Sequence, residues 1–338
     1  MGRNLSLFER YALTRTQLGF SPVISIVVTY PIDKVPTAQS LEDRLAHLQT
    51  VWPHLHAQIV DADATPSWAA GTPCSFVRPG ESPSKDLEGM LREENQYKDG
   101  PMLQVTRYTS HLGFTIRHEL ADGIGALRLV HAILSTETFS PESTPPALED
   151  VVNLKVPTLS LLGILFDKLV LGKIWPTPVW PETKPTGSNR LSLISLSPSL
   201  LDRVEAARKI HAPTTSIHAV ITTAWTLALQ SVVGPATFTA GTPRSERQAS
   251  YCLGNYVTSS AFRFTPHILQ QPFWQIATQV GLSLKTGTDK ARQNVGMLAY
   301  VPAGWKEYWQ EEAGKPYGDS WELSNLGKTT PLQWLAQP

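Results

Sequence analysis

The sequence predicts an α/β protein in which both halves mix strands and helices, consistent with two similar lobes. Three observations indicate this fold class. Runs of β-branched residues typical of strands alternate with apolar residues at helical spacing, and this mixture occurs in both halves of the chain, which a proline-rich stretch separates. The 338 residues are enough for two domains with buried cores.

The N-terminal half, residues 1–140, is expected to form the first lobe. Its expected elements are helices over 5–18, 40–52 and 86–97, and strands over Val23–Tyr30, His54–Val60, Met102–Tyr108 and Gly113–Arg117. We expect Ser40 to cap the second helix and Pro53 to end it. The last two strands could pair as a hairpin, which would bring the residue after Arg117 to the sheet edge.

Residues 141–190 are expected to form a linker, because eight prolines accumulate there around one apolar helix. The apolar run Leu159–Phe166 is too short to span a bilayer. It could rest on a membrane surface, but packing on the body of the protein is the favoured interpretation.

Residues 191–338 are expected to form the second lobe. Its expected elements are strands over Arg190–Leu196, Ala236–Ala240 and Val257–Phe264, helices over Leu200–Ile210, from Thr214 onward and over Phe273–Lys290, and turns over Gly241–Arg244 and Leu253–Tyr256. Ser197 and Pro198 form the expected start of the first helix of this lobe.

Composition and charge exclude several classes of function. A net charge of zero, from 29 basic and 29 acidic residues, gives no electrostatic footprint for nucleic acid. Cys74 and Cys252 are too few for a disulfide framework or a cysteine-based zinc site, and they fit a reducing, cytoplasmic location. His54 and His56 could be two metal ligands, but no third ligand lies nearby, so ordinary strand histidines are expected and no metal site.

The candidate active site lies in the turn between a buried strand and a helix, where α/β proteins expose reactive side chains. His118 follows the strand Gly113–Arg117, and Asp122 and Gly123 come directly before the helix. An imidazole can act as general base because its pKa lies near the working pH. The aspartate, four residues on, would instead fix the turn by pairing with an arginine or with backbone amides, and Gly123 would allow close backbone approach.

The same residues also suggest other interpretations. Gly123 and Gly125 resemble part of a dinucleotide fingerprint, but Arg128 occupies the place of the third glycine. The sequence contains no Gly-x-Ser-x-Gly elbow and no Gly-Lys-Ser/Thr phosphate loop. A histidine that merely packs at the strand end is as plausible as a base when the motif is taken by itself.

The stretch His118-Glu119-Leu120-Ala121-Asp122-Gly123 resembles the HxxxDG motif of the CoA-dependent acyltransferase superfamily, and most closely that of fungal alcohol acetyltransferase-like proteins. The supporting stretches are Glu9-Arg10, Trp52-Pro53-His54-Leu55, Thr242-Pro243-Arg244, Leu253-Gly254-Asn255-Tyr256-Val257 and Ser324-Asn325-Leu326-Gly327, in the order and spacing of the family. The resemblance implies a chloramphenicol-acetyltransferase-like fold, with a channel between two lobes and the histidine at its centre.

The resemblance also implies roles for single residues. His118 matches the family base, and Asp122 the aspartate that is usually paired with an arginine of the second lobe, for which Arg244 is the candidate. Asn255, Ser324 and Asn325 match turns that line the channel, and one of them is expected to donate to the oxyanion. Acyl-CoA would be a co-substrate rather than a permanently bound cofactor, and the acceptor a small-molecule alcohol or amine.

Two departures from the family pattern leave alternatives open. Arg117 stands where condensation domains often carry a first histidine, which argues against a peptide-bond-forming module. Only Lys328–Pro338 follow the last motif, so the second lobe is expected to be shortened at its C-terminus, with an open sheet edge that favours a homo-oligomer. The alternatives are a cyclase or epimerase on the same fold and a non-catalytic paralogue.

Overall fold

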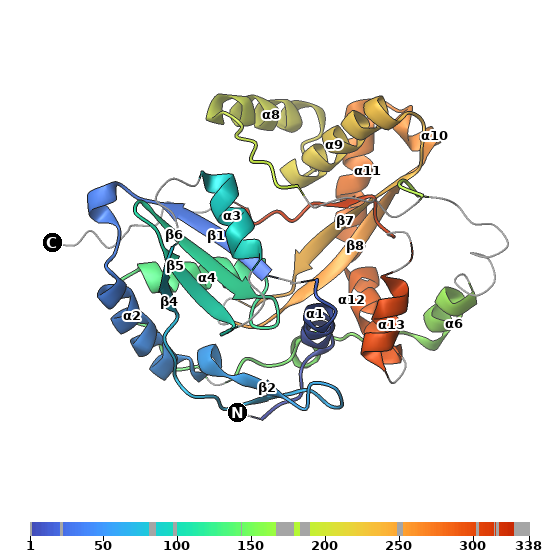
Figure 1. Ribbon diagram of the computed structural model, residues 1–338. Coiled ribbons are helices and arrows are strands. Elements are labelled where there is room, and N and C mark those ends of the chain that lie inside the picture. The colour runs from blue at the N-terminus through green and yellow to red at the C-terminus, as the bar shows by residue number, and fades with distance from the viewer. Residues whose placement is uncertain are drawn as a thin grey trace. The chain divides into compact units, whose positions relative to one another are not determined.

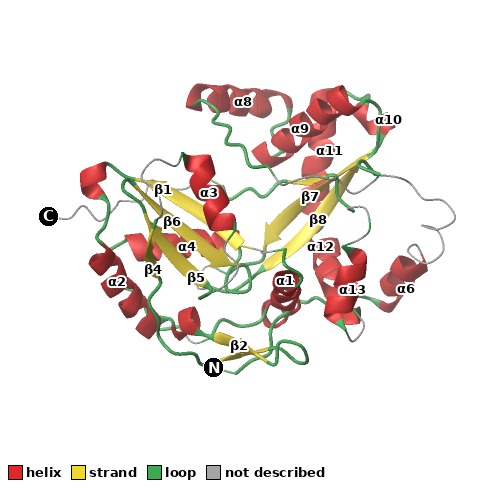
Figure 2. Cartoon of the chain, viewed as in Figure 1, coloured by secondary structure: helices red, strands yellow, loops and turns green. Residues whose placement is uncertain are grey.

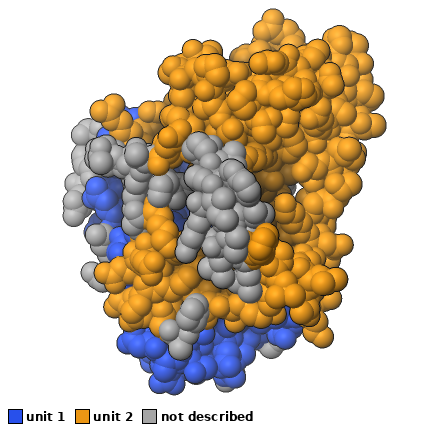
Figure 3. Space-filling model, turned by 90° about the vertical axis from the view of Figure 1, so that its right-hand side faces the viewer, with its two compact units in different colours: residues 1–152, 245–257, 326–338 blue, residues 153–244, 258–325 orange. Residues whose placement is uncertain are grey.

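The computed structural model describes two compact units of the chain, each coloured separately in Figure 3. Unit 1 comprises Met1–Val152, Ser245–Val257 and Leu326–Pro338, and unit 2 comprises Asn153–Arg244 and Thr258–Asn325. The described residues are 2–20, 23–80, 86–96, 100–142, 144–166, 179–182, 190–248, 253–301, 304–313, 315 and 318–327.

This division differs from the predicted lobes in three places, one of which is that Leu326–Pro338, predicted for the second lobe, belongs to unit 1. The first unit continues to Val152, twelve residues into the predicted linker of residues 141–190. Ser245–Val257, which the sequence analysis placed in the second lobe, belongs to the first unit. The turn that carries Asn255 is therefore part of the same unit as His118.

Unit 1 is built on a four-stranded mixed sheet with the strand order β1-β6-β5-β4 (Figure 2). Its strands are β1 (Val23–Thr29), β4 (Val77–Pro79), β5 (Leu103–Arg107) and β6 (His111–Arg117). The predicted hairpin is confirmed, because β5 and β6 pair in antiparallel fashion with Leu103 opposite Ile116. β1 pairs antiparallel with β6, whereas β4 runs parallel to β5.

The two faces of β6 contact different helices of unit 1. Its side chains at Leu112, Phe114 and Ile116 are fully buried in one apolar core with residues of α4. On the other face the hydroxyl of Thr115 donates to Glu94 of α3. The strand is thus covered on both sides up to its last residue, Arg117, as in the ribbon of Figure 1.

The remaining elements of unit 1 surround this sheet. They are α1 (Leu7–Gln17), α2 (Ala38–Val51), α3 (Leu87–Asn95), α4 (Gly123–Leu134), α5 (Leu148–Val151), the 3-10 turns η1 (Ile32–Lys34) and η2 (Pro53–His56), and the hairpin β2 (Gln58–Val60) with β3 (Ser67–Ala69). The N-cap of α2 is Thr37 rather than Ser40. The predicted strand His54–Val60 is only partly correct, because Pro53 starts a helical turn that runs through His56.

Unit 2 contains a three-stranded sheet with the order β8-β7-β9. Its elements are β7 (Phe238–Ser245), β8 (Val257–Phe264), β9 (Trp321–Glu322), α6 (Thr158–Phe166), α8 (Pro198–His211), α9 (Ile217–Val233), α10 (Pro266–Leu269), α11 (Phe273–Thr286), α12 (Thr288–Gly296), α13 (Trp305–Glu312) and η4 (Met297–Tyr300). A core that includes Phe238, Phe264 and Ile276 lies between this sheet and the helices α9 and α11.

Three predictions for unit 2 are corrected by the structure. Residues 190–196 form no strand, and Ile194 and Leu196 are 74% and 52% exposed. The predicted turn Gly241–Arg244 belongs to β7, which continues to Ser245. The predicted helix Phe273–Lys290 is two helices, because the N–H of Gly287 donates to the carbonyl of Ser283 and ends α11 there.

No helix among the described residues combines the length and apolar character needed to cross a membrane. The apolar helix α6 exposes Leu159, Leu162 and Phe166. Contact of this helix with a membrane surface stays a prediction.

Candidate active site

The turn after β6 is held in place by a second segment of unit 1, Leu253–Tyr256. Ala121 and Gly254 form a parallel β-bridge. The N–H of Gly254 donates to the carbonyl of Leu120 at 3.1 Å, and the N–H of Asp122 donates to the carbonyl of Gly254 at 3.3 Å. Two segments far apart in sequence therefore share one small backbone ladder at the candidate site.

Asp122 is the anchor of this turn. Its buried carboxylate accepts, through Oδ1, a hydrogen bond of 2.8 Å from the N–H of Gly125, and so caps α4. The same oxygen lies 2.8 Å from Nη2 of Arg247. Oδ2 accepts from the N–H of Tyr256 at 2.8 Å. The predicted structural role of Asp122, pairing with an arginine and with backbone amides, is what this geometry provides.

The arginine that pairs with Asp122 is Arg247, which corrects the assignment of this role to Arg244. Arg247 also donates from Nη1 to the carbonyl of Leu253 at 2.9 Å and from Nη2 to that of Gly254 at 2.6 Å. Its guanidinium lies 4.9 Å from the centre of the Tyr256 ring. One buried cation thus joins the carboxylate to the segment that carries Asn255.

Arg244 lies in unit 2 and is engaged elsewhere, with the carbonyl of Leu284 and, at 2.8 Å, the hydroxyl of Thr288. The physical reason is the length of β7. Because the strand continues to Ser245, Arg244 is still a strand residue, and the chain leaves the sheet only afterwards. The signal that could have found Arg247 was present, since a second arginine follows three residues after the first.

Glycines at the start of α4 permit close packing around the carboxylate. A Cβ atom at Gly125 would lie 2.6 Å from Nη2 of Arg247. At Gly123, which was predicted to allow close approach, a Cβ atom would lie 2.7 Å from Cδ2 of Leu326. Side chains at these two positions would push the arginine or Leu326 away.

Asn255 contacts His118 directly. Its Nδ2 donates to the backbone carbonyl of His118 at 2.7 Å and lies 3.1 Å from ring atom Nδ1. The ring of Phe8 flanks the imidazole at 5.8 Å between centroids. The half-buried imidazole forms no hydrogen bond through Nε2 with any residue that the structure describes, so this nitrogen is available for a substrate.

The surroundings of His118 favour its neutral form. Burial is the largest effect and lowers the pKa of the imidazole below its ordinary value of 6.5, and Arg15 lowers it further. A hydrogen bond with the backbone of His118 itself and the carboxylates of Asp122 and Glu119 raise this pKa and offset part of the shift. At neutral pH the imidazole is therefore in the form that a general base requires.

Glu119 is a buried carboxylate that the sequence analysis did not single out. Its Oε1 lies 2.8 Å from Nη2 of Arg117 and accepts from the hydroxyl of Thr16 at 2.8 Å. Glu119 occupies one of the three variable positions of the HxxxDG pattern, so the motif gives no signal that this carboxylate pairs with Arg117. The contact fixes both neighbours of His118 to helix α1 and to each other.

The candidate channel residues lie in different places. The amide nitrogen of Asn255 is engaged with His118, so this residue positions the imidazole and is poorly suited to donate to an oxyanion. Ser324 and Asn325 follow β9 in unit 2. A role of these two residues in the channel stays a prediction.

A cavity of about 670 Å³ in unit 1 adjoins the end of β6. It is lined by Leu13, Leu55, His56, Ala57, Gln58, Ile59, Ala62, Thr72, Pro73, Cys74, Gly100, Pro101, Met102 and Arg117. The mixture of apolar and polar lining residues is typical of pockets for small molecules. Across the described ranges, His, Cys, Asp and Glu do not gather in a group of three or more that could hold a metal ion, and Cys252 lies outside these ranges.

Comparison with solved structures supports the fold. No family model matches the sequence, and no curated protein sequence matches it. Among solved structures, the first condensation domain of the calcium-dependent antibiotic synthetase is similar with a TM-score of 0.66 and 11% identity, over 96% of this chain and 79% of that one.

Two further structures are similar over nearly the whole chain. The trichothecene 15-O-acetyltransferase TRI3 from Fusarium sporotrichioides has a TM-score of 0.63 and 13% identity, over 96% of this chain and 79% of that one. A mutant starter condensation domain of rhizomide synthetase, in complex with C8-CoA and Leu-SNAC, has a TM-score of 0.63 and 16% identity, over 96% of this chain and 78% of that one. The chain therefore has the mixed α/β fold of condensation domains and chloramphenicol-acetyltransferase-like acyltransferases.

Proposed function

We propose that this protein is an acyltransferase that moves an acyl group, acetyl in our expectation, from CoA to a hydroxyl or amine of a small molecule. One observation carries the proposal. A half-buried imidazole, with Nε2 available, is held by Asn255 at a turn that Asp122 and Arg247 brace from inside unit 1. Such rigid placement of a neutral histidine is what general base catalysis needs.

In the proposed reaction, Nε2 of His118 accepts the proton of the acceptor hydroxyl or amine as its oxygen or nitrogen attacks the thioester carbonyl. The tetrahedral intermediate collapses with cleavage of the carbon–sulfur bond. The imidazolium then returns the proton to the departing CoA thiolate, so that His118 is neutral again after each turnover.

The similar structures support acyl transfer at a coarse level. One of them is named as an acetyltransferase, and another was solved with C8-CoA bound. The resemblance of His118–Gly123 to the HxxxDG motif supports the finer assignment of acyl-CoA as co-substrate, and the further stretches named in the sequence analysis support a likeness to fungal alcohol acetyltransferase-like proteins.

We place the acceptor in the cavity of unit 1 that adjoins β6. Arg117 lines this cavity and directly precedes His118 in the chain, whereas His118 itself is not among the lining residues. Met102 forms another part of its wall. Met102→Trp should fill the cavity and raise KM for the acceptor more than it lowers kcat.

The test of the function is His118→Ala, assayed by release of free CoA from acetyl-CoA with a panel of small alcohols and amines. We expect turnover to fall by about 10²- to 10⁴-fold, the usual contribution of a general base. The matched control is His47→Ala, which removes an exposed histidine on α2 and should leave turnover unchanged. Turnover in His118→Ala that equals the wild type, with an intact circular dichroism spectrum, would refute the role of this residue.

The pH dependence gives a second test. The rate should be constant at neutral pH and fall as the pH drops through the pKa of His118, which lies below 6.5 because burial disfavours the imidazolium. A rate that falls with an apparent pKa above 6.5 would point to another base.

A further inference from the structure

Arg15 of α1 lies on the same face of its helix as Phe8, whose ring flanks the imidazole of His118. The two residues are seven positions apart, which is about two helical turns. Cζ of Arg15 lies 5.8 Å from the centre of the Tyr11 ring, and that ring lies 5.8 Å from the ring of Phe8. The guanidinium is therefore turned back along α1, toward the end of the helix that contacts His118.

Helix α1 is fixed to the strand end that carries His118. The hydroxyl of Thr16 donates to Oε1 of Glu119 at 2.8 Å, and Glu119 directly follows His118 in the chain. Burial is the largest cause of the lowered pKa of His118, and the positive charge of Arg15 lowers this pKa further, as expected of a neighbouring cation. A rigid element thus holds Arg15 near the proposed base.

The half-buried Arg15 has no anionic partner among the residues that the structure describes. Its guanidinium donates no hydrogen bond to these residues and contacts the face of Tyr11. The two carboxylates of the HxxxDG stretch are each paired with another arginine, in the pairs Arg247–Asp122 and Arg117–Glu119. Three guanidinium groups and two carboxylates of the described structure therefore lie around His118, which leaves one positive charge in excess.

This excess charge opposes the step that His118 is proposed to perform. The imidazole becomes a cation when it takes up a proton, and a guanidinium nearby raises the free energy of that cation. A substrate that brought a negative charge to Arg15 would remove this opposition. The donors of a guanidinium form a planar fork that matches the two oxygens of a carboxylate.

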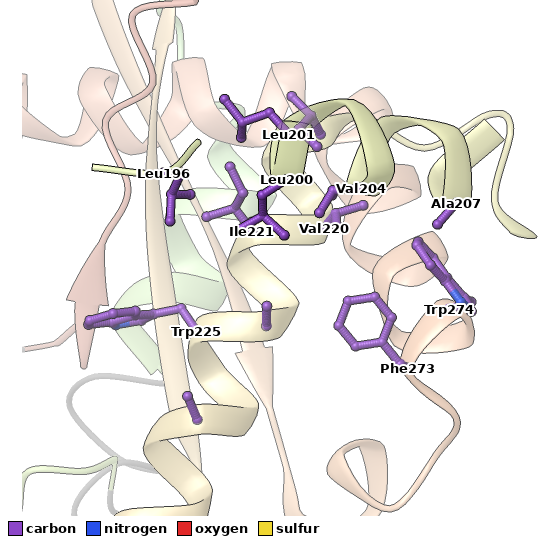
Figure 4. A pocket seen from close by; sticks show the side chains of 13 residues that line it. Leu196, Leu200, Leu201, Val204, Ala207, Val220, Ile221, Trp225, Phe273 and Trp274 are labelled. Carbon is purple, nitrogen blue, oxygen red and sulfur yellow. The ribbon is translucent and has the colours of Figure 1, made fainter. Parts of the chain in front are cut away.

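The apolar hollow between α8, α9 and α11 in unit 2 allows no such choice of ligand (Figure 4). Its volume is about 430 Å³, and its described lining side chains, such as Leu200, Ile221 and Phe273, are all aliphatic or aromatic. Such a lining offers no charge that would select one class of ligand. Arg15, by contrast, specifies the charge of the group that it binds.

We propose that Arg15 binds a carboxylate carried by one of the two substrates that meet at His118. The inference rests on the proposed function and narrows its substrate class to short dicarboxylic acyl groups, in place of acetyl, or to hydroxy acids and amino acids as acceptors. Leu13, which lines the cavity assigned to the acceptor, lies on the opposite face of α1 from Arg15. An acceptor in that cavity leaves Arg15 to the acyl group, whereas a carboxylate on the acceptor would place the acceptor along the Arg15 face instead.

The acyl group is tested with succinyl-CoA and butyryl-CoA, whose acyl chains have equal length and differ in the terminal carboxylate. Rates of the wild type and of Arg15→Gln are measured at pH 8, where the imidazole is neutral in both proteins. We expect Arg15→Gln to lower kcat/KM for succinyl-CoA about ten- to a hundredfold, the contribution of a charged hydrogen bond, and to leave butyryl-CoA unaffected. An equal loss for both thioesters would place the contact at the phosphates of CoA and overturn the proposal.

The acceptor is tested with short hydroxy acids and amino acids, each compared with its primary amide, and with acetyl-CoA as donor. A preference for acid over amide that disappears in Arg15→Gln would assign the carboxylate to the acceptor. Arg15→Lys, which keeps the charge without the planar fork, should retain part of the preference in either series. The matched control is Arg10→Gln, at a half-buried position on a different face of α1, which should leave both preferences unchanged.

These measurements separate failure of this inference from failure of the proposed function. If His118→Ala loses turnover while Arg15→Gln keeps the wild-type preference in both series, acyl transfer stands and the carboxylate site is refuted. Arg15→Gln that lowers only the free energy of unfolding would likewise leave Arg15 as a cation that stabilises the last turn of α1. If His118→Ala keeps full turnover, the proposed function fails. Calorimetric titration of both proteins with the same acids and their neutral counterparts then decides the site, and equal affinities would overturn it.

Discussion

Unit 1 buries charged groups, whereas the buried polar side chains in the described part of unit 2 are uncharged. Among the described residues, the acidic side chains with almost no exposed surface are Glu9, Glu94, Glu119 and Asp122, all in unit 1. The buried polar residues of the described part of unit 2 are all threonines, such as Thr222 and Thr226. A threonine can satisfy its hydroxyl within its own helix, as Thr226 does by donating to the carbonyl of Thr222.

Each buried carboxylate of unit 1 has an arginine partner. The nearest nitrogen–oxygen distances are 2.7 Å for Arg3–Glu9, 3.5 Å for Arg78–Glu94, 2.8 Å for Arg117–Glu119 and 2.8 Å for Arg247–Asp122. Buried ion pairs contribute little net stability but are costly to break, and they fix geometry. The comparison teaches that the interior of unit 1 is fixed by paired charges, whereas that of the described part of unit 2 is not.

The largest expected effect is that of Arg247→Met, which leaves the carboxylate of Asp122 buried without its cation. Unfolding free energy, measured with urea, should fall by about 3–5 kcal/mol. The counterpart in unit 2 is Arg208→Met, which removes the i,i+3 partner of Glu205 and two hydrogen bonds to the carbonyls of Pro213 and Thr215 but leaves no buried charge unpaired, and it should have a smaller effect. The double variant Asp122→Asn/Arg247→Met should be more stable than Arg247→Met alone. Equal losses of unfolding free energy in Arg247→Met and Arg208→Met would contradict the inference that unit 1 depends more strongly on its ion pairs than unit 2.

The second effect concerns the stability of unit 1 at acidic pH. His54 is 2% exposed, and neither of its ring nitrogens has a hydrogen-bond partner among the described residues. Burial, the largest effect, lowers the pKa of His54 to about 4. Because the unfolded chain then binds the proton more tightly, stability should be full above pH 6.5 and should fall by about 3 kcal/mol as the pH drops toward 4.

His54→Phe removes this titration and should flatten the dependence of the unfolding free energy on pH between 6.5 and 4. Chemical denaturation at three pH values measures it. His47→Phe, at an exposed position of α2, should keep the wild-type slope. A slope that survives in His54→Phe would assign the acid sensitivity to other groups.

The third effect is catalytic and rests on the proposed function. Asn255→Ala removes the amide that holds His118 and should lower kcat about tenfold, the equivalent of ~1.4 kcal/mol for one hydrogen bond, with little change in KM. Asn153→Ala, which removes an exposed asparagine of unit 2, is the control. A rise in KM with unchanged kcat would show that Asn255 contacts substrate rather than the base.

The smallest effect is that of Asp319→Asn in unit 2. The stability contributed by Asp319 falls as the pH rises, whereas that of His54 falls as the pH drops. Burial, followed by the nearby Glu322, raises the pKa of Asp319 to about 6. The folded chain therefore binds this proton more tightly, and the stability it contributes is present below about pH 4 and is lost as the pH rises through 6.

At pH 7, Asp319→Asn should stabilise the protein by about 1 kcal/mol, a value discounted because the side chain is partly exposed. Thermal unfolding at pH 7 and pH 4 measures the difference. Asp202→Asn, at an exposed position of α8, should have no effect at either pH. A loss of stability in Asp319→Asn at pH 7 would refute the inferred ionisation.

The local part of the candidate site could be predicted from the sequence. His118, Asp122 and Gly123 lie between a strand and a helix whose patterns are unambiguous, so their order along the chain determines their place in the fold. The partner of Asp122 could not be predicted, because the choice between Arg244 and Arg247 depends on the residue at which β7 leaves the sheet. Strand ends are set by pairing with distant segments, which a local pattern does not contain.

Pairing with distant segments also explains another difference between the predicted and the observed structure. Residues 190–196 alternate like a strand, yet the sheet of unit 2 is formed by β8, β7 and β9 without them.

The hydrogen bond from Tyr256 to Asp122 joins residues 134 positions apart in the chain. During synthesis on the ribosome, the motif that carries His118 emerges long before the segment that secures it. A nascent chain arrested before residue 245 would contain His118, Asp122 and α4. It would lack the guanidinium of Arg247 and the backbone N–H of Tyr256, which both contact the carboxylate of Asp122. The surroundings of His118 are therefore completed only late in translation, although His118 itself is synthesised in the first half of the chain.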